Sequence, residues 1–407
     1  MRPLAERTGT DDGNADRTAM IRWLARCRLA AVALCVLGLA LAAGSVLLAS
    51  APGTGRGALP EGQSARSWQI PSALPAQEEP PYPAVAYLPL ALHSFWQGPY
   101  WSGTARFGFC AAARPAEEYN LSRLYADWYV QYPGFRSDQG PGELEYVQII
   151  RLNDKFNPPS QEEIVRYARY HPGTLWLIGN EPDAPAQDCV PPTEYALLYH
   201  ELYHLLKTAD PQAQVAIGGV VQGTPLRLRY LDQVLAEYQS LFGEKIPVDV
   251  WNVHGFILRE RVDSWGCQVP CGLSATQGKL YDIDDHDDME IFIEQIVRFR
   301  RWMKDNGERN KPLIVSEYGI LLPLALGYDQ DRVERFMLAT FDYFTTATSG
   351  SLGYPEDGNR LVQAWAWYSL DHKNFGGYKS YGHLFDPDTR RITPLGLAYG
   401  SYTSALR

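Results

Sequence analysis

Beyond about residue 100, short apolar runs alternate with longer stretches in which apolar residues recur every three or four positions. Runs of this kind, nearly continuous in hydrophobicity, are typical of parallel strands that are buried on both faces. We expect eight such strands, at Arg106–Cys110, Trp128–Tyr132, Tyr146–Leu152, Leu175–Gly179, Val215–Val220, Val248–His254, Leu313–Glu317 and Val362–Tyr368. The periodic stretches between most of them predict amphipathic helices. These cover Glu162–Tyr170, Thr193–Thr208, Leu228–Phe242, Met289–Asp305 and Arg332–Thr346.

The number and order of these elements indicate the fold class. Eight short strands separated by helices over roughly 300 residues favour an α/β fold of the closed (β/α)8 TIM-barrel type. An open doubly wound sheet is the alternative. Its dinucleotide fingerprint is missing, because Gly218–Gly223 does not read Gly-x-Gly-x-x-Gly and no dinucleotide loop follows the first strand. We therefore predict a (β/α)8 domain over residues 104–407.

The N-terminal part of the chain has a different pattern. Residues 29–51 carry no charge and are long enough to cross a bilayer as a single transmembrane helix. Three arginines immediately precede the span, and no basic cluster follows closely, so the positive-inside tendency puts residues 1–28 in the cytoplasm. The Pro- and Gly-rich segment 52–103 then reads as an extracytoplasmic linker. This predicts a single-pass cell-membrane protein whose barrel lies outside the cell.

A cleaved signal peptide is the competing interpretation of the span. Ala49-Ser50-Ala51 has the small-x-small form of a cleavage site. However, the apolar stretch is longer than a usual signal core, and Pro52 would become the first mature residue. These two features favour an uncleaved signal anchor.

The amino-acid composition indicates which classes of molecule the protein can bind. Hydrophobic residues make up 45% of the chain and aromatic residues 12%, which is enough for a substantial core. The formal net charge of −10 argues against nucleic acid, whose phosphates favour clustered Lys and Arg. The 11 Trp and 25 Tyr provide flat amphipathic rings of the kind that stack on sugars.

The cysteines fit an oxidising compartment. Four of them lie beyond the span, at Cys110, Cys189, Cys267 and Cys271. An even number allows two disulfides. Cys267 and Cys271 could close a small loop, in which case Cys110 and Cys189 would join distant segments. A zinc site is the less favoured alternative, because the spacing contains no Cys-x-x-Cys pair.

Two glutamates each follow an apolar run directly. Leu175–Gly179 leads into Asn180-Glu181-Pro182, and the later run ending at Ser316 leads into Glu317. Counted along the chain, these are the fourth and seventh strands. Because the carboxyl ends of barrel strands form the active-site face, both side chains are expected to meet there. A pair of carboxyl groups is what cleavage of a glycosidic bond requires.

With these motifs, the chain resembles the clan of retaining glycoside hydrolases with (β/α)8 barrels over about residues 104–407. The resemblance implies that Glu181 is the acid/base and Glu317 the nucleophile of a double displacement, and that Asn180 binds the sugar 2-hydroxyl. It implies carboxyl groups about 5–5.5 Å apart, no cofactor and no metal. The expected activity is cleavage of O-glycosidic bonds in a poly- or oligosaccharide, with β-linked glucans as an analogy from the clan.

The sixth strand also resembles the clan, in which it often ends His-x-Tyr. His254 matches this motif, but Phe256 replaces the tyrosine that commonly hydrogen-bonds the nucleophile. What orients Glu317 is therefore open. A non-catalytic carbohydrate-binding barrel is the second hypothesis for this reason, and His254 itself could be a buried core histidine.

Aromatic residues near the last two strands complete the candidate substrate-binding set. Trp365 and Trp367 alternate along the eighth strand and so share one face. The clan places an aromatic sugar platform there, and Trp367 is nearer the carboxyl end of the strand. Trp365 and Tyr318, which follows Glu317, are further candidates, although core packing is the competing interpretation for Trp365.

One motif suggests a different activity. His200-Glu201-Leu202-Tyr203-His204 is a literal His-Glu-x-x-His, which on a helix puts two histidines on one face for zinc. No third protein ligand follows in residues 205–208. We expect both histidines near the solvent side of an outer helix, and a zinc metalloprotease is the least favoured alternative.

A run of acidic residues lies at Asp282–Asp288. A calcium loop is one interpretation. The favoured one is an acidic start to the following helix, which the helix dipole stabilises.

Overall fold

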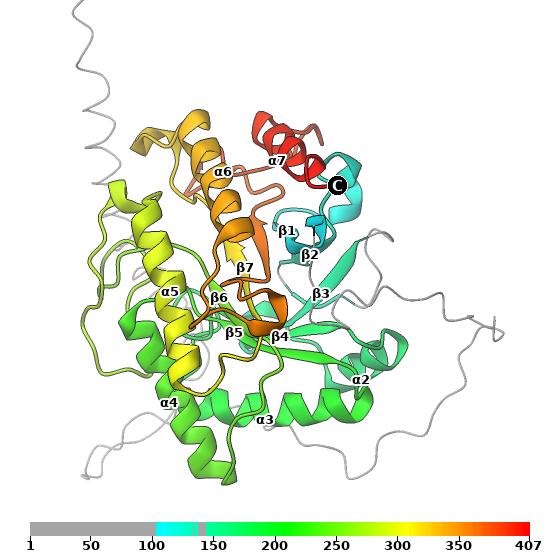
Figure 1. The fold of residues 1–407 in the computed structure, drawn as a ribbon, viewed down its shortest axis with the longest axis vertical. Coiled ribbons are helices and arrows are strands. Elements are labelled where there is room, and N and C mark those ends of the chain that lie inside the picture. The colour runs from blue at the N-terminus through cyan, green and yellow to red at the C-terminus, as the bar shows by residue number, and fades with distance from the viewer. Residues whose placement is uncertain (1–102, 133, 137–143) are drawn as a thin grey trace, which may run out of the picture. The chain divides into compact units, whose positions relative to one another are not determined.

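A computed structural model describes residues 103–132, 134–136 and 144–407 (Figure 1). The predictions for residues 1–28 and 29–51, and for all of the linker except Gly103, therefore concern residues outside the described ranges. Among the helices that are described, none combines the length and the hydrophobicity that a membrane crossing needs.

Eight parallel strands form the centre of the described domain. They are β1 (Phe107–Ala111), β2 (Trp128–Gln131), β3 (Glu145–Ile150), β4 (Leu175–Asn180), β5 (Gln214–Gly219), β6 (Trp251–His254), β7 (Leu313–Tyr318) and β8 (Ala364–Tyr368). They pair in the order β5-β4-β3-β2-β1-β8-β7-β6. Parallel bridges from Ala216 to Val250 and from Val220 to Val253 connect β5 to β6 and so join the two ends of the sheet. The predicted eight-stranded parallel barrel is confirmed.

Helices lie outside the strands (Figure 1). They are α2 (Gln161–Tyr170), α3 (Pro192–Ala209), α4 (Pro225–Phe242), α5 (Met289–Asp305), α6 (Gln330–Thr346) and α7 (Pro394–Ser404). The sequence predicted α2 to α6 to within a turn but missed α7. Gly396 and Gly400 interrupt its helical pattern of apolar residues. Glycine is needed at both positions, because a Cβ at Gly396 would collide with the Leu384 carbonyl and one at Gly400 with the Arg123 carbonyl. Between β1 and β2 the connection consists of short 3-10 turns (Ala116–Glu118 and Leu121–Arg123).

The interior of the barrel is filled by Trp128 and by small and aliphatic side chains that alternate along the strands. The cluster includes Val130, Ile149, Leu177, Ile314 and Ala366. Because successive side chains of a strand point to opposite faces, the other set packs against the helices. This alternation determines which residues at the strand ends can reach the same site.

One disulfide joins Cys189, in the loop after β4, to Cys271, in the long loop after β6. The predicted pairing of Cys267 with Cys271 is therefore wrong. The backbone N–H of Cys271 donates to the carbonyl of Asp183, which holds this part of the β6 loop against the β4 loop. Cys110 cannot pair with Cys189, because it points into the barrel, where its thiol faces the Ser316 carbonyl.

The acidic run forms the start of α5, as the favoured interpretation predicted. The Asp288 side chain accepts from the N–H groups of Glu290 and Ile291, and Asp282 caps the short turn before it. Asp287 forms an ion pair with Arg332 of α6. These contacts account for the acidic residues as helix caps and a helix–helix contact.

Candidate active site

The structure brings Glu181 and Glu317 together around His254. The Nδ1 atom of His254, the last residue of β6, lies 3.0 Å from a carboxyl oxygen of Glu181 and 3.8 Å from one of Glu317. One polar atom of each residue lies within 4.8 Å of the others. Each glutamate is 8% exposed, so both carboxyl groups are largely desolvated but not sealed from solvent.

A β-bulge gives Glu317 its direction. Val253 of β6 pairs with Val315, but the next residue, His254, pairs with Glu317, so β7 carries one extra residue, Ser316. Ile314 points into the barrel. Strict alternation would therefore turn Glu317 outward, and the extra residue instead brings it to the His254 side. The same shift turns Tyr318 outward.

Glu181 is fixed by the loop that follows β4. Its backbone has a φ of 42°, a left-handed conformation that is uncommon for a residue with a side chain. Asp188 from the same loop accepts the N–H of Asn180 at 2.8 Å and the Nε of Arg151 at 2.8 Å. A network of this kind can hold a strained backbone in place. Gly219 at the end of β5 leaves the room that the His254 ring occupies, since a Cβ there would lie 2.5 Å from that ring.

The two carboxyl groups have different proton affinities. Burial, together with nearby Asp183, raises the pKa of Glu181 to about 8. Burial also raises the pKa of Glu317, to about 7, although His254 acts in the opposite direction. Burial lowers the pKa of His254 below its usual value. Between pH 7 and 8 the pair therefore favours one proton, held on Glu181, with Glu317 ionised.

Tyr132 is a site residue that sequence reasoning missed. It directly follows β2, and its hydroxyl donates to the side-chain oxygen of Asn180 at 3.2 Å. Interaction of the same hydroxyl with Glu317 lowers the pKa of that carboxyl group, as a hydrogen bond to the ionised form does. The signal was available, because Tyr132 ends an apolar run in the same way as the two glutamates.

Phe256 makes no such contact. It is buried in a small apolar cluster with Ala184 and Val221, above the end of β6. The tyrosine that the resemblance leads one to expect at this position is thus replaced by a packing residue. Tyr132 approaches Glu317 from β2 instead.

Three predicted aromatic residues lie on the wrong face of the barrel for a sugar site, and this corrects the prediction. Trp367 has no exposed surface and packs edge-on against Tyr318, with its indole N–H donating to the Gly382 carbonyl. Trp365 packs on Phe344 of α6, and Tyr318 also contacts this helix. All three belong to the layer between strands and helices. Tyr368, the last residue of β8, takes the inward position beside Tyr132.

A buried network of ion pairs connects α4 to the loops that carry the site. The Arg227 guanidinium of α4 donates to Asp183 at 2.7 Å and to Glu260 at 3.0 Å, and all three side chains are fully buried. The same guanidinium donates to the carbonyls of Cys267 and Gln268. Arg227 therefore ties the loop after β4, which carries Glu181, to the loop after β6.

The fold and the site together define a closed parallel barrel with two neighbouring buried carboxyl groups at its strand ends. No protein-family model and no curated protein matches the chain. Solved structures to which it is similar include glycoside hydrolases. A GH128 (subgroup II) endo-β-1,3-glucanase from Pseudomonas viridiflava aligns over 73% of this chain and 97% of its own, with 16% identity and a TM-score of 0.49.

Two further similar structures are also named as glycosidases. A curdlan-specific exo-β-1,3-glucanase of GH128 (subgroup III) from Blastomyces gilchristii aligns over 74% of this chain and 100% of its own, with 14% identity and a TM-score of 0.46. A β-xylosidase from Caulobacter crescentus aligns over 74% of this chain and 68% of its own, with 12% identity and a TM-score of 0.48. At these identities the similarity concerns the path of the chain alone.

Proposed function

We propose that the protein is a glycoside hydrolase that cleaves an O-glycosidic bond by a retaining double displacement. The observation that carries the proposal is the Glu181–His254–Glu317 arrangement, in which carboxyl oxygens lie within 4.8 Å. Inverting enzymes need carboxyl groups about 6.5–9.5 Å apart to admit a water, whereas retaining enzymes need about 5–5.5 Å. The short separation supports the retaining geometry.

Each carboxyl group has a role that fits its protonation state. In the first step, Glu181 donates its proton to the glycosidic oxygen, which leaves as an alcohol, while the Glu317 carboxylate bonds to the anomeric carbon. In the second step, Glu181 removes a proton from water, whose oxygen bonds to the anomeric carbon and releases Glu317. His254 positions both groups, and the Asn180 amide is placed by Tyr132 and Gln187 to bind a sugar hydroxyl.

We further propose that this site lies outside the cell, with residues 29–51 as the membrane anchor. The Cys189–Cys271 disulfide supports an oxidising compartment. The substrate class is a β-linked glucan or a related surface polysaccharide. Protease accessibility of the barrel in intact cells, before and after permeabilisation, tests the topology.

The activity is tested with a panel of aryl glycosides and of β-1,3-, β-1,4- and β-1,6-linked glucans. Glu317→Gln abolishes turnover, because an amide is a poor nucleophile. Glu181→Ala retains activity only on substrates with good leaving groups, and azide restores the second step to give a glycosyl azide of retained configuration. Full activity in Glu317→Gln, or an inverted product seen by proton NMR, contradicts the proposal.

A carbohydrate-binding barrel without turnover is the second candidate. The observation that favours it is Phe256, which provides no hydroxyl for the nucleophile. Saturable glycan binding by the wild-type protein, with no product released from any member of the panel, would support this candidate over the hydrolase.

A further inference from the structure

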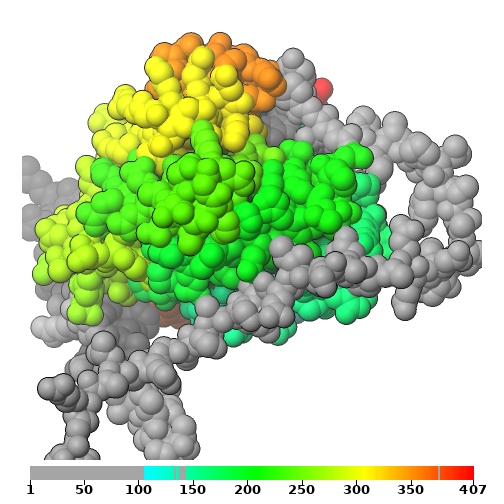
Figure 2. Space-filling model, turned by 90° about the horizontal axis from the view of Figure 1, so that it is seen from below, coloured from blue at the N-terminus to red at the C-terminus, as the bar shows by residue number. Residues whose placement is uncertain are grey.

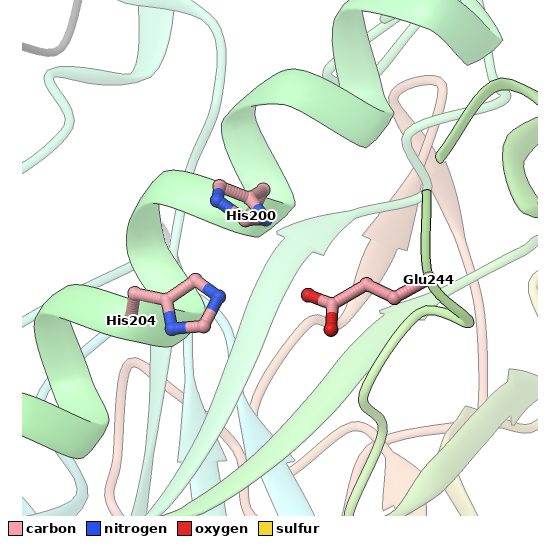
Figure 3. A group of neighbouring side chains, drawn as sticks. All are labelled: His200, His204 and Glu244. Carbon is pink, nitrogen blue, oxygen red and sulfur yellow. The ribbon is translucent and has the colours of Figure 1, made fainter. Parts of the chain in front are cut away.

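The two histidines of the His-Glu-x-x-His motif lie on α3 and face a third polar side chain (Figure 3). His200 and His204 are one turn apart, with ring centroids 4.4 Å apart. Glu244, just beyond α4, extends its carboxylate toward both rings. One ligating atom from each of the three residues lies within 4.8 Å of the others. The sequence offered no third ligand within the helix, and the fold supplies one from the residues that follow the neighbouring helix α4.

The His200 ring is held in place by contacts outside the three residues. Its Nδ1 lies 2.8 Å from the hydroxyl of Tyr238, and its face stacks on Phe242, with ring centroids 3.7 Å apart. Histidines that bind a metal through one ring nitrogen usually engage the other with an oxygen partner, which fixes the ring. Tyr238 supplies this partner and leaves Nε2 as the nitrogen available to an ion.

Glu244 owes its position to the end of α4. Gly243 ends the helix in a left-handed conformation with φ of 72°, and Glu244 follows it directly. The adjacent Lys245 pairs with Glu308 instead. Glu244 is exposed and both histidines are half-buried, so an ion can reach the cluster from solvent. Figure 2 views the molecule from below, and the green segments there, which include α3 and α4, form part of its surface.

We propose that His200, His204 and Glu244 form a binding site for a divalent transition-metal ion, with Zn²⁺ as the ion of choice. Two imidazoles and a carboxylate are a common zinc donor set, and water completes the tetrahedron. Such an ion bridges α3 to the end of α4 and stabilises the helix layer. It binds in the helix layer, away from the strand-end carboxyl groups, and is independent of the proposed glycosidase activity.

This site differs from that of a metalloprotease with the same motif. In such enzymes the Glu of His-Glu-x-x-His is the general base beside the metal. Here Glu201 is partly buried and does not belong to the convergent group, whose carboxylate comes from Glu244. The role of the site is therefore structural, and Glu201 is not required for the ion to bind.

The test uses the full chain, freed of any polyhistidine tag and treated with a chelator. Zn²⁺ is titrated by calorimetry, and Co²⁺ is titrated as a spectroscopic probe of tetrahedral coordination. One ion per chain is expected, and His204→Ala and Glu244→Gln each weaken binding at least tenfold. Tyr238→Phe weakens it about tenfold, in the range for loss of an outer-shell partner.

Glu201→Gln and Glu317→Gln are the matched controls, and both retain the ion. Zinc raises the melting temperature of the wild-type chain but not of Glu244→Gln, whose exposed position leaves folding intact. Equal affinity in wild-type, His204→Ala and Glu244→Gln overturns the proposal. Loss of the ion in Glu317→Gln also overturns it, because that result assigns the ion to the Glu181–His254–Glu317 group.

Discussion

The hydroxyl of Tyr132, at the end of β2, donates a 3.2 Å hydrogen bond to the side chain of Asn180, at the end of β4. The same hydroxyl lowers the pKa of Glu317. One tyrosine therefore contacts the residue proposed to bind the sugar and stabilises the ionised form of the proposed nucleophile. Tyr132 follows β2, on the opposite side of the barrel from β6. Phe256 follows β6 and stands where the resemblance leads one to expect a tyrosine that contacts Glu317.

Removal of this hydroxyl tests its role. Tyr132→Phe is expected to lower kcat by about 10- to 100-fold, which corresponds to about 1.4–2.7 kcal/mol of transition-state stabilisation. The acidic limb of the pH–rate profile should move to higher pH, because Glu317 loses a partner for its ionised form. Tyr125→Phe, at an exposed position before β2, is the control. An unchanged acidic limb would show that Tyr132 does not act on Glu317.

The pH dependence of activity follows from the two carboxyl groups. The active state needs Glu317 ionised, with a pKa of about 7, and Glu181 protonated, with a pKa of about 8. The rate at low substrate should rise through about pH 7 and fall above about pH 8, which gives a narrow bell. Measurement of kcat/KM from pH 5 to 10 on an activated substrate checks this. A flat plateau from pH 5 to 7 would contradict it.

The raised pKa of Glu181 also affects stability. Between pH 4.5, the ordinary pKa of a glutamate, and about pH 8, Glu181 keeps its proton in the native state but has released it in the unfolded chain. The free energy of unfolding therefore falls as pH rises through this window. Glu181→Gln removes this dependence and should be more stable than wild type at pH 8.5, by up to about 1.4 kcal/mol for each unit of the pKa shift, with little difference at pH 4.5. Thermal unfolding at both pH values measures the effect. Glu162→Gln, exposed on α2, should behave like wild type at both.

Arg227 is expected to be indispensable to the fold. Arg227→Met leaves the buried carboxylates of Asp183 and Glu260 without their counter-ion, and should cost about 3–5 kcal/mol of stability. Arg229→Met is the matched control, because Arg229 lies two residues further along α4 and is exposed. Denaturant unfolding compares the two variants. Similar losses in both would show that Arg227 contributes no more than a surface arginine.

The strand predictions succeeded because burial on both faces leaves a continuous apolar run that depends only on neighbouring residues. The convergence of Glu181 and Glu317 followed from the strand count. Tyr318 and the two tryptophans were misplaced for a different reason. Their faces depend on a bulge in β7 and on which set of β8 residues points inward, and both are settled by pairing with other strands.

Contacts between distant loops were the least predictable. Cys189 and Cys271 are 82 residues apart, and they meet because the loops after β4 and β6 fold against one another. Spacing along the chain favoured the nearer pair, Cys267 and Cys271. Glu244 likewise approaches His200 and His204 only because α3 and α4 are neighbours in the barrel. Such pairings depend on tertiary packing rather than on local pattern.

The extra residue in β7 makes the chemistry of this barrel depend on chain length as well as on residue identity. Insertion of one residue between Ser316 and Glu317 would place the new residue opposite His254, turn Glu317 out among the helices and present the Tyr318 phenol to the site. Every residue around the site would still be present, yet the acid pair would be broken. A scan of point substitutions samples no such change, so insertions and deletions in this strand are the more informative route to altered or abolished activity.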